Sequence, residues 1–177
     1  PNEETSDWQT ADLAAQFLED DHDKPFFLGC GIYRPHLSWY APRKYFDLHP
    51  IDQVELPYHV EDDLSDIPEM GRRMSGEEFN IVRKPGQWKN AVQGYLAACS
   101  FADACVGRVL DALEKSRHRD NTIVVLWGDH GYHIGAKDHF AKSALWRETS
   151  RTPLIVHVPG EATGRCVRSV GLVDLYP

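Results

Sequence analysis

Two stretches of the chain have the spacing of apolar residues that is typical of amphipathic helices. Residues 7–20 place their apolar side chains on one side of a helix, and Ser6 or Asp7 is positioned to cap its first turn. Residues 88–116 predict a longer helix, in which apolar side chains recur at intervals of four and three: Trp88, Val92, Tyr95, Cys99, Ala102, Val106, Val109 and Leu113. Coiled coils share this pattern, but Cys, Ala and Tyr on the seam favour a helix that packs one stripe onto a sheet.

Three short, continuously apolar runs predict buried strands at residues 26–32, 122–127 and 154–158. Continuous apolar strands joined by a long amphipathic helix indicate a mostly parallel sheet that helices cover on both faces. The fold class is therefore expected to be α/β.

Residues 33–87 interrupt this pattern with many Pro, Gly and charged residues, and predict a long loop-rich excursion from a single domain. The acidic clusters at 20–23 and 61–63 are expected to be solvated. Patterned segments run close to both ends of the sequence. Residues 1–177 are therefore expected to be part of one larger catalytic domain whose N-terminal portion is missing.

Composition excludes several classes of partner. Hydrophobic residues make up 42% of the 177 positions and the net charge is −8, which does not indicate binding to nucleic acid or to an anionic membrane. No apolar run is long enough for a membrane span, and the polar start is not a signal peptide. The four cysteines lack metal-binding spacing and are expected to be buried free thiols, which leaves the redox compartment open.

Candidate chemistry is concentrated after the strand expected at 122–127. Asp129 and His130 follow it directly, and ligands of open α/β sheets bind at the carboxyl ends of strands. A carboxylate and an imidazole together can ligate a metal ion, and the flanking Gly128 and Gly131 permit a sharp turn. Lys142 could supply a point charge for a phosphate or sulfate oxygen. The alternative is an ordinary turn in which Asp129 accepts local N–H groups.

A second candidate is His36, which follows the strand expected at 26–32 within the segment Arg34-Pro35-His36. A histidine in this position is also compatible with a purely structural role, and the same holds for His133 and His139. Motifs for a serine-hydrolase elbow, a zinc protease, a phosphate-binding loop and a dinucleotide fold are absent from the sequence.

Three ordered motifs resemble the sulfatase family of the alkaline-phosphatase-like superfamily, in particular its iduronate sulfatase and choline sulfatase branch. They are PFFLGCGIYRPHLSWYAPRKYFDLHP at 25–50, TIVVLWGDHGYHIGAKDHFAK at 122–142 and SRTPLIVHVPG at 150–160. The resemblance implies an alkaline-phosphatase-like sheet and the hydrolysis of sulfate esters, with sulfated carbohydrate as the expected substrate. It also implies a periplasmic, secreted or lysosomal location.

Matching positions carry the family's roles over to four residues. By resemblance, Asp129 and His130 are metal ligands, with Ca²⁺ expected and another divalent cation possible. Lys142 contacts the sulfate group, and His36 binds sulfate oxygen or handles a proton. The sequence departs from the pattern at Ala136, where an acidic residue is usual, and at Tyr33-Arg34, which leaves the substrate in doubt more than the chemistry.

The family's nucleophile is not found in this chain. Sulfatases make formylglycine from the Cys or Ser of a C/S-x-P/A-x-R motif; Cys30–Arg34 and Ser143–Arg147 each lack the Pro or Ala. The formylglycine and the other metal ligands are therefore expected upstream, and these 177 residues alone are expected to be inactive. Two alternatives stay open, another alkaline-phosphatase-like phospho-hydrolase and a domain that binds sulfated glycans without cleaving them. The oligomeric state is open as well.

Overall fold

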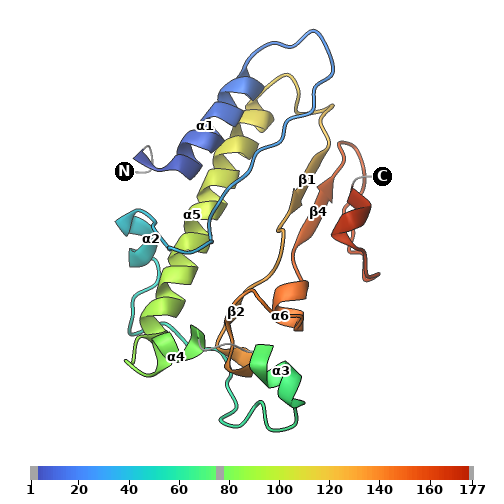
Figure 1. Cartoon of the computed structure of the whole chain (residues 1–177). Helices are drawn as coiled ribbons and strands as arrows, with labels where there is room; N and C mark the ends of the chain where they lie inside the picture. Colours follow the sequence, from blue (N-terminus) through green and yellow to red (C-terminus); the bar gives the residue numbers. More distant parts are fainter. Residues whose placement is uncertain (1–3, 75–77, 176–177) are drawn as a thin grey trace.

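The computed structural model describes residues 4–74 and 78–175 of the chain (Figure 1). Two helices, α1 (Ser6–Glu19) and α5 (Trp88–Lys115), lie side by side, and a ribbon of β1 (Val124–Trp127) and β4 (Leu154–His157) lies beside them. The remaining elements are short: α2 (Arg43–Asp47), α3 (Glu69–Met74), α4 (Glu78–Arg83), β2 (His133–Ile134), β3 (Phe140–Ala141), α6 (Arg147–Ser150) and the 3₁₀ turns η2 (Ala136–Asp138) and η3 (Leu172–Leu175). The α/β class is confirmed.

The helix expected at 7–20 is α1, but its cap differs from the prediction. Thr5 adopts extended backbone geometry, and its hydroxyl accepts the N–H of Trp8 at 3.4 Å, so Thr5 is the N-cap instead of Ser6 or Asp7. Asp7 lies inside the first turn and is buried. Because Asp7 does not cap the helix, its carboxylate is available to accept hydrogen bonds from the backbone of residues 33–34.

The helix expected at 88–116 is α5, and its partner was predicted wrongly. Its buried face packs mainly against α1 and α2, because small residues allow close approach. Ala97 and Cys105 of α5 and Ala11 of α1 are each fully buried, with Phe101 and Tyr45 in the same cluster. The buried face of α5 therefore differs from the predicted one and packs against another helix. At one end of α5 a strand residue, Val124 of β1, contacts this face.

Residues 26–32, expected to be a strand, form no ladder in the structure. The segment is extended and alternates: Phe26, Leu28 and Ile32 pack against the helix cores, while Phe27 points to solvent. Phe26, Leu28 and Ile32 were predicted correctly to pack in the interior, whereas the prediction was wrong for Phe27. Continuous apolar character cannot distinguish a laddered strand from an extended segment that packs on helices.

The strands β1 and β4 form an antiparallel pair, with Val124 opposite His157 and Trp127 opposite Leu154. The hairpin of β2 and β3 is antiparallel too, so both ladders among the described residues differ from the expected parallel pairing. The reason is that the chain leaves β1 and enters β4 at the same end. Most of β1 and β4 is exposed, and no helix covers both faces of this ribbon in the described part of the chain.

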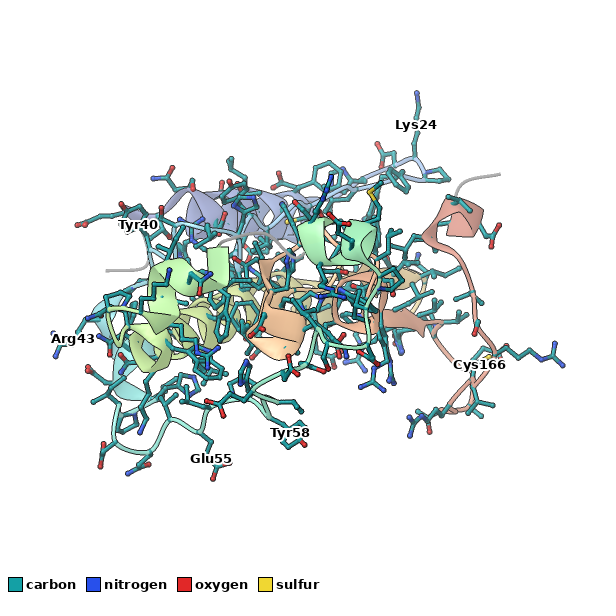
Figure 2. All side chains as sticks on the ribbon, turned by 60° about the horizontal axis from the view of Figure 1, so that its bottom comes forward. Lys24, Tyr40, Arg43, Glu55, Tyr58 and Cys166 are labelled. Atoms are coloured by element: carbon teal, nitrogen blue, oxygen red, sulfur yellow. The ribbon has the colours of Figure 1, made fainter. Side chains whose placement is uncertain are left out.

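The cysteines follow the expectation only in part. None forms a disulfide among the described residues, and Cys105 is buried, but Cys30 and Cys166 are exposed. Cys166 lies at the outer edge of the molecule, as does Lys24 (Figure 2). Across residues 4–74 and 78–175, none of the helices has the length and apolar character needed to traverse a bilayer.

Candidate functional site

The pair Asp129-His130 follows β1 directly, as expected. The Oδ1 atom of Asp129 accepts the backbone N–H of His130 at 3.0 Å, so the local turn contact that the alternative requires is present. The Nδ1 atom of His130 lies 2.7 Å from the carbonyl oxygen of Gly131, which can only accept. A neutral His130 therefore carries its proton on Nδ1 and its lone pair on Nε2.

The free donor atoms of this pair converge. Oδ2 of Asp129 and Nε2 of His130 are 3.5 Å apart, and the Asp129 side chain is 84% exposed. Two ligand atoms at this separation can share one cation. A cation at roughly 2.4 Å from both atoms would form an angle of about 90° with them, which is an ordinary ligand–metal–ligand angle. The donor set fits a divalent cation, but no group of three or more His, Cys, Asp or Glu side chains is gathered within the described ranges. These two residues would be a partial ligand set.

Close packing holds the turn in place. The N–H of Gly131 donates to the carbonyl oxygen of Thr149 at 2.8 Å, and the Thr152 hydroxyl donates to that of Gly128 at 2.8 Å. A Cβ atom on Gly131 would lie 2.8 Å from the carbonyl oxygen of Arg151 and closer still to that of Glu148. Only glycine fits here, because the neighbouring atoms are backbone.

We expect Gly131→Ala to destabilise the protein by about 1–3 kcal/mol, since the added methyl must displace backbone next to α6. Gly107→Ala is the matched control, because a Cβ at this position inside α5 meets no atom within 4 Å. It should add about 0.5–1 kcal/mol by restricting the unfolded chain. Denaturant unfolding of the two variants checks this, and an unchanged midpoint for Gly131→Ala would refute the packing argument.

His36 lies in a loop that a buried carboxylate fixes. Asp7, only 4% exposed, accepts the backbone N–H groups of Tyr33 at 3.1 Å and of Arg34 at 3.0 Å. The His36 ring stacks on Tyr33, and its Nδ1 lies 2.9 Å from the tyrosine hydroxyl and 2.5 Å from the carbonyl oxygen of Leu37. Because that carbonyl only accepts, Nδ1 donates, and Nε2 of a neutral His36 is available to a ligand.

We expect Asp7→Ala to lower the free energy of unfolding by about 2–4 kcal/mol, because it removes a buried, charged acceptor from two partly buried N–H groups. Amide exchange at residues 33–36 should accelerate in the same variant. The control is Asp23→Ala, whose side chain is exposed. Equal stability of the two variants would show that Asp7 does not hold the loop.

Trp39 docks the His36 loop onto the hairpin of β2 and β3. Its indole N–H donates to the carbonyl oxygen of Pro35 at 2.9 Å, and its ring makes edge contacts with Tyr132 and Phe140. Phe140 is a buried member of the core cluster that also contains Phe79 of α4. The loop that carries His36 and the hairpin that leads to Lys142 therefore share one apolar core.

Lys142 follows β3 and is half-buried. Within residues 4–74 and 78–175 its ammonium group has no hydrogen-bond or ion-pair partner. In the same ranges, no hydrogen bond or ion pair connects Lys142 or His36 with the Asp129-His130 pair. Lys137, five residues earlier, is instead bound to Asp63, with 2.6 Å between Nζ and Oδ1. This hydrogen bond holds the pKa of Asp63 below its usual range and raises the pKa of Lys137.

Two other histidines, His133 and His139, lie in the interior of the hairpin. The side chains of His133 and His139 are buried and meet edge to face, at 4.9 Å between ring centres. Burial lowers the pKa of His133, and its Nδ1 donates to the carbonyl oxygen of Ala136 at 3.0 Å. Both rings are packed inside the hairpin, which is compatible with the structural role expected for them.

Sequence reasoning missed the residues that hold these loops. Asp7 was read as a capping residue, and Asp63 was placed on a solvated acidic face, which is wrong because its side chain is only 20% exposed and binds Lys137. Trp39 and His59 were not singled out. Their partners lie far away in the chain, and local patterning carries no signal for such contacts.

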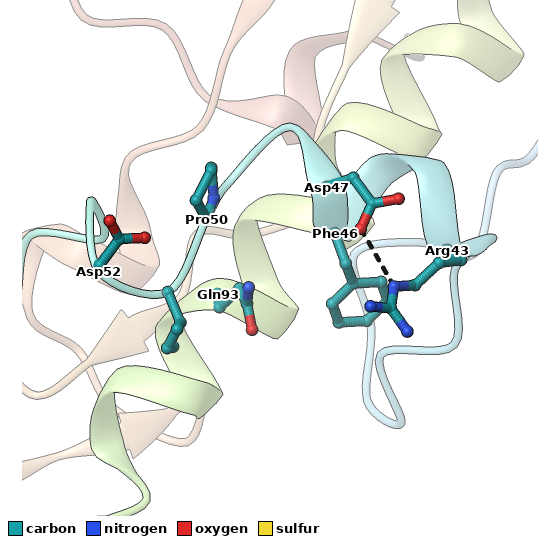
Figure 3. Close-up of a pocket in the computed structure, with 7 residues that line it drawn as sticks. Arg43, Phe46, Asp47, Pro50, Asp52 and Gln93 are labelled. Carbon is teal, nitrogen blue, oxygen red and sulfur yellow. Dashed lines mark hydrogen bonds and ion pairs between the residues drawn. The ribbon is translucent and has the colours of Figure 1, made fainter.

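A hollow beside α2 and α5 is separate from these residues (Figure 3). Arg43 in it is paired with Asp47 at 3.0 Å, so its charge is already neutralised. The hollow is lined by Arg43, Phe46, Asp47, Pro50, Ile51, Asp52 and Gln93, which include none of the four candidate site residues. Its two carboxylates make it a poor place for a sulfate or phosphate group.

The described residues form a partial α/β domain with the alkaline-phosphatase-like fold. In this domain an acid–imidazole pair lies at the end of a strand, and a lysine lies on the adjoining hairpin. The family described as Sulfatase matches residues 1–177, and the chain belongs to the sulfatase family. It is 40% identical to a sulfatase of Formosa agariphila, over 97% of this chain and 35% of that protein. It is 30% identical to the iduronate 2-sulfatase of Mus musculus, over 87% of this chain and 30% of that protein.

A solved structure of a protein in complex with its substrate D-glucosamine-2-N,6-O-disulfate superposes with a TM-score of 0.69. The match covers 87% of this chain and 43% of that one at 20% identity, so it shows the shared fold. The chain spans about a third of the length of the curated relatives it matches.

Proposed function

We propose that the full-length protein carrying this chain hydrolyses sulfate esters of carbohydrates, and that Asp129, His130, Lys142 and His36 serve that reaction. The observation that carries the proposal is the convergence of the Asp129 and His130 donor atoms after β1, together with a lysine on the adjoining hairpin whose ammonium has no partner among the described residues. Membership of the sulfatase family supports the reaction class. The name of the mouse relative and the sugar disulfate bound in the solved structure support a carbohydrate.

In this proposal Asp129 and His130 hold a divalent cation, with calcium the expected one. When bound, such a cation polarises the oxygens of the sulfate group. The turn at Gly128 and Gly131 keeps the two ligand atoms on one side, so little reorganisation is needed to bind the ion. The remaining ligands and a formylglycine nucleophile are expected from polypeptide outside residues 1–177.

Lys142 and His36 act on the substrate itself. The ammonium of Lys142 binds a non-bridging sulfate oxygen and stabilises the charge that grows there in the transition state. When the His36 ring is protonated, its Nε2–H donates to another sulfate oxygen or gives its proton to the oxygen of the leaving sugar, since Nδ1–H is already used by the carbonyl oxygen of Leu37. Asp7 and Trp39 keep that imidazole on the hairpin side of the domain.

Sulfate release from sulfated monosaccharides tests the proposal directly. Full-length protein should release inorganic sulfate from an O-sulfated glucosamine or an iduronate sulfate, as measured by ion chromatography. Binding without release would favour the non-catalytic alternative. Release of phosphate from the corresponding sugar phosphates, with no sulfate release, would favour a phospho-hydrolase.

A further inference from the structure

The hairpin that leads to Lys142 is too short to be stable alone. Its ladder joins only His133 to Ala141 and Ile134 to Phe140. Three non-glycine residues of this hairpin adopt positive φ angles: Lys137 at 55°, Asp138 at 47° and Ala141 at 77°. Such backbone persists only where surrounding contacts determine it.

The first such contact comes from the excursion 33–87 and joins Asp63 to Lys137. The backbone N–H of Lys137 donates to Oδ2 of Asp63 at 3.1 Å. Its ammonium donates to Oδ1 at 2.6 Å and to the carbonyl oxygen of Asp63 at 3.0 Å. Three hydrogen bonds thus join two residues that are 74 positions apart, and both side chains are less than one-third exposed.

A second contact lies one residue further along the hairpin. The Nε2 atom of His59 is 2.7 Å from Oδ1 of Asp138, and a guanidinium nitrogen of Arg83 is 3.5 Å from the same oxygen. The His59 ring packs against Phe79 and Trp88.

Trp88 reaches the hairpin as well. Its indole N–H donates to the carbonyl oxygen of Ile134 at 2.7 Å. The excursion and the start of α5 together therefore bind to β2 and to the turn after it. In addition, α4 packs against β3.

We propose that Asp63 and His59 are positioning residues that set the place of Lys142, an inference that rests on the proposed role of Lys142 in sulfate ester hydrolysis. Lys142 follows Ala141 directly, and no hydrogen bond or ion pair in the described ranges fixes its ammonium, so its position depends on the hairpin backbone. Asp63 also neutralises Lys137, whereas the ammonium of Lys142 has no ion-pair partner within residues 4–74 and 78–175. The excursion thereby controls the geometry of the sulfate-binding charge.

Charge exchange across the first contact tests this inference in the full-length protein. Asp63→Lys and Lys137→Asp should each lower kcat for 4-nitrophenyl sulfate by about 10–100-fold, the loss expected from displacement of a group by roughly 1 Å. KM should change less than kcat. The double variant, which restores an opposite-charge pair, should recover at least part of the lost kcat. Asp62→Lys makes the same charge change at an exposed neighbour and should resemble wild type.

Amide exchange of residues 133–142 gives a readout that does not depend on turnover. Each single variant should exchange there at least about tenfold faster, with α1 and α5 unchanged. Unchanged exchange in Asp63→Lys would overturn the inference, as would faster exchange with wild-type kcat. A wild-type protein without sulfatase activity would overturn the proposed function instead, and the exchange of the hairpin would still decide whether Asp63 holds it.

Discussion

Lys142→Ala is expected to lower kcat for a sulfate ester by about 10²–10³-fold in the full-length protein, the usual loss when one preorganised group that stabilises transition-state charge is removed. The reason is that the Lys142 ammonium lacks a partner in the described part of the chain, whereas Lys137 nearby is bound to Asp63. In the proposed function, a half-buried ammonium without a partner among the described residues is available to bind an anionic ligand.

The control for Lys142→Ala is Lys24→Ala, since Lys24 extends from the periphery (Figure 2) and should be silent. Initial rates and thermal unfolding of both variants separate catalysis from folding. Lys142→Ala should unfold like wild type, because no hydrogen bond or ion pair of its ammonium is lost within residues 4–74 and 78–175. Wild-type kinetics in that variant would remove Lys142 from the site.

Asp129→Ala should weaken the binding of calcium to the full-length protein by at least about 100-fold, with a matching loss of turnover. The carboxylate oxygen that faces Nε2 of His130 at 3.5 Å disappears, and one imidazole remains as the ligand from this turn. The fold should survive, because the Asp129 side chain is largely exposed and, within the described part of the chain, its polar contacts are with His130. Calorimetric titration with calcium measures the change.

Asp111→Ala is the matched control for Asp129→Ala, since it removes an exposed carboxylate from α5. It should leave both calcium binding and turnover unchanged. Equal calcium affinity of Asp129→Ala and wild type would show that Asp129 serves only the turn, which is the role that its bond to the His130 N–H already supports.

The sequence predicted the features that depend on local pattern. Helix periodicity located α1 and α5, and apolar runs with Gly128 and Pro159 at their ends located β1 and β4. The placement of Asp129 and His130 after β1 followed from the same run.

Features that depend on distant partners were not predictable in this way. The segment at 26–32 has the apolar content of a strand, but its neighbours on one side are helices. The contacts of Asp63 and His59 with the hairpin cross 74 and 79 positions, and either residue alone looks like part of a polar loop. The candidate site could thus be located from the sequence, while the residues that hold its loops emerged only from the three-dimensional contacts.

Turnover of 4-nitrophenyl sulfate, compared with 4-nitrophenyl phosphate and a phenylphosphonate ester, tests the central claim most directly. The full-length protein should hydrolyse the sulfate ester with the highest kcat/KM of the three, and the preference should collapse in Lys142→Ala. Preference for the phosphate or phosphonate ester, or no turnover of any of them, would contradict the assignment of these residues to sulfate ester hydrolysis.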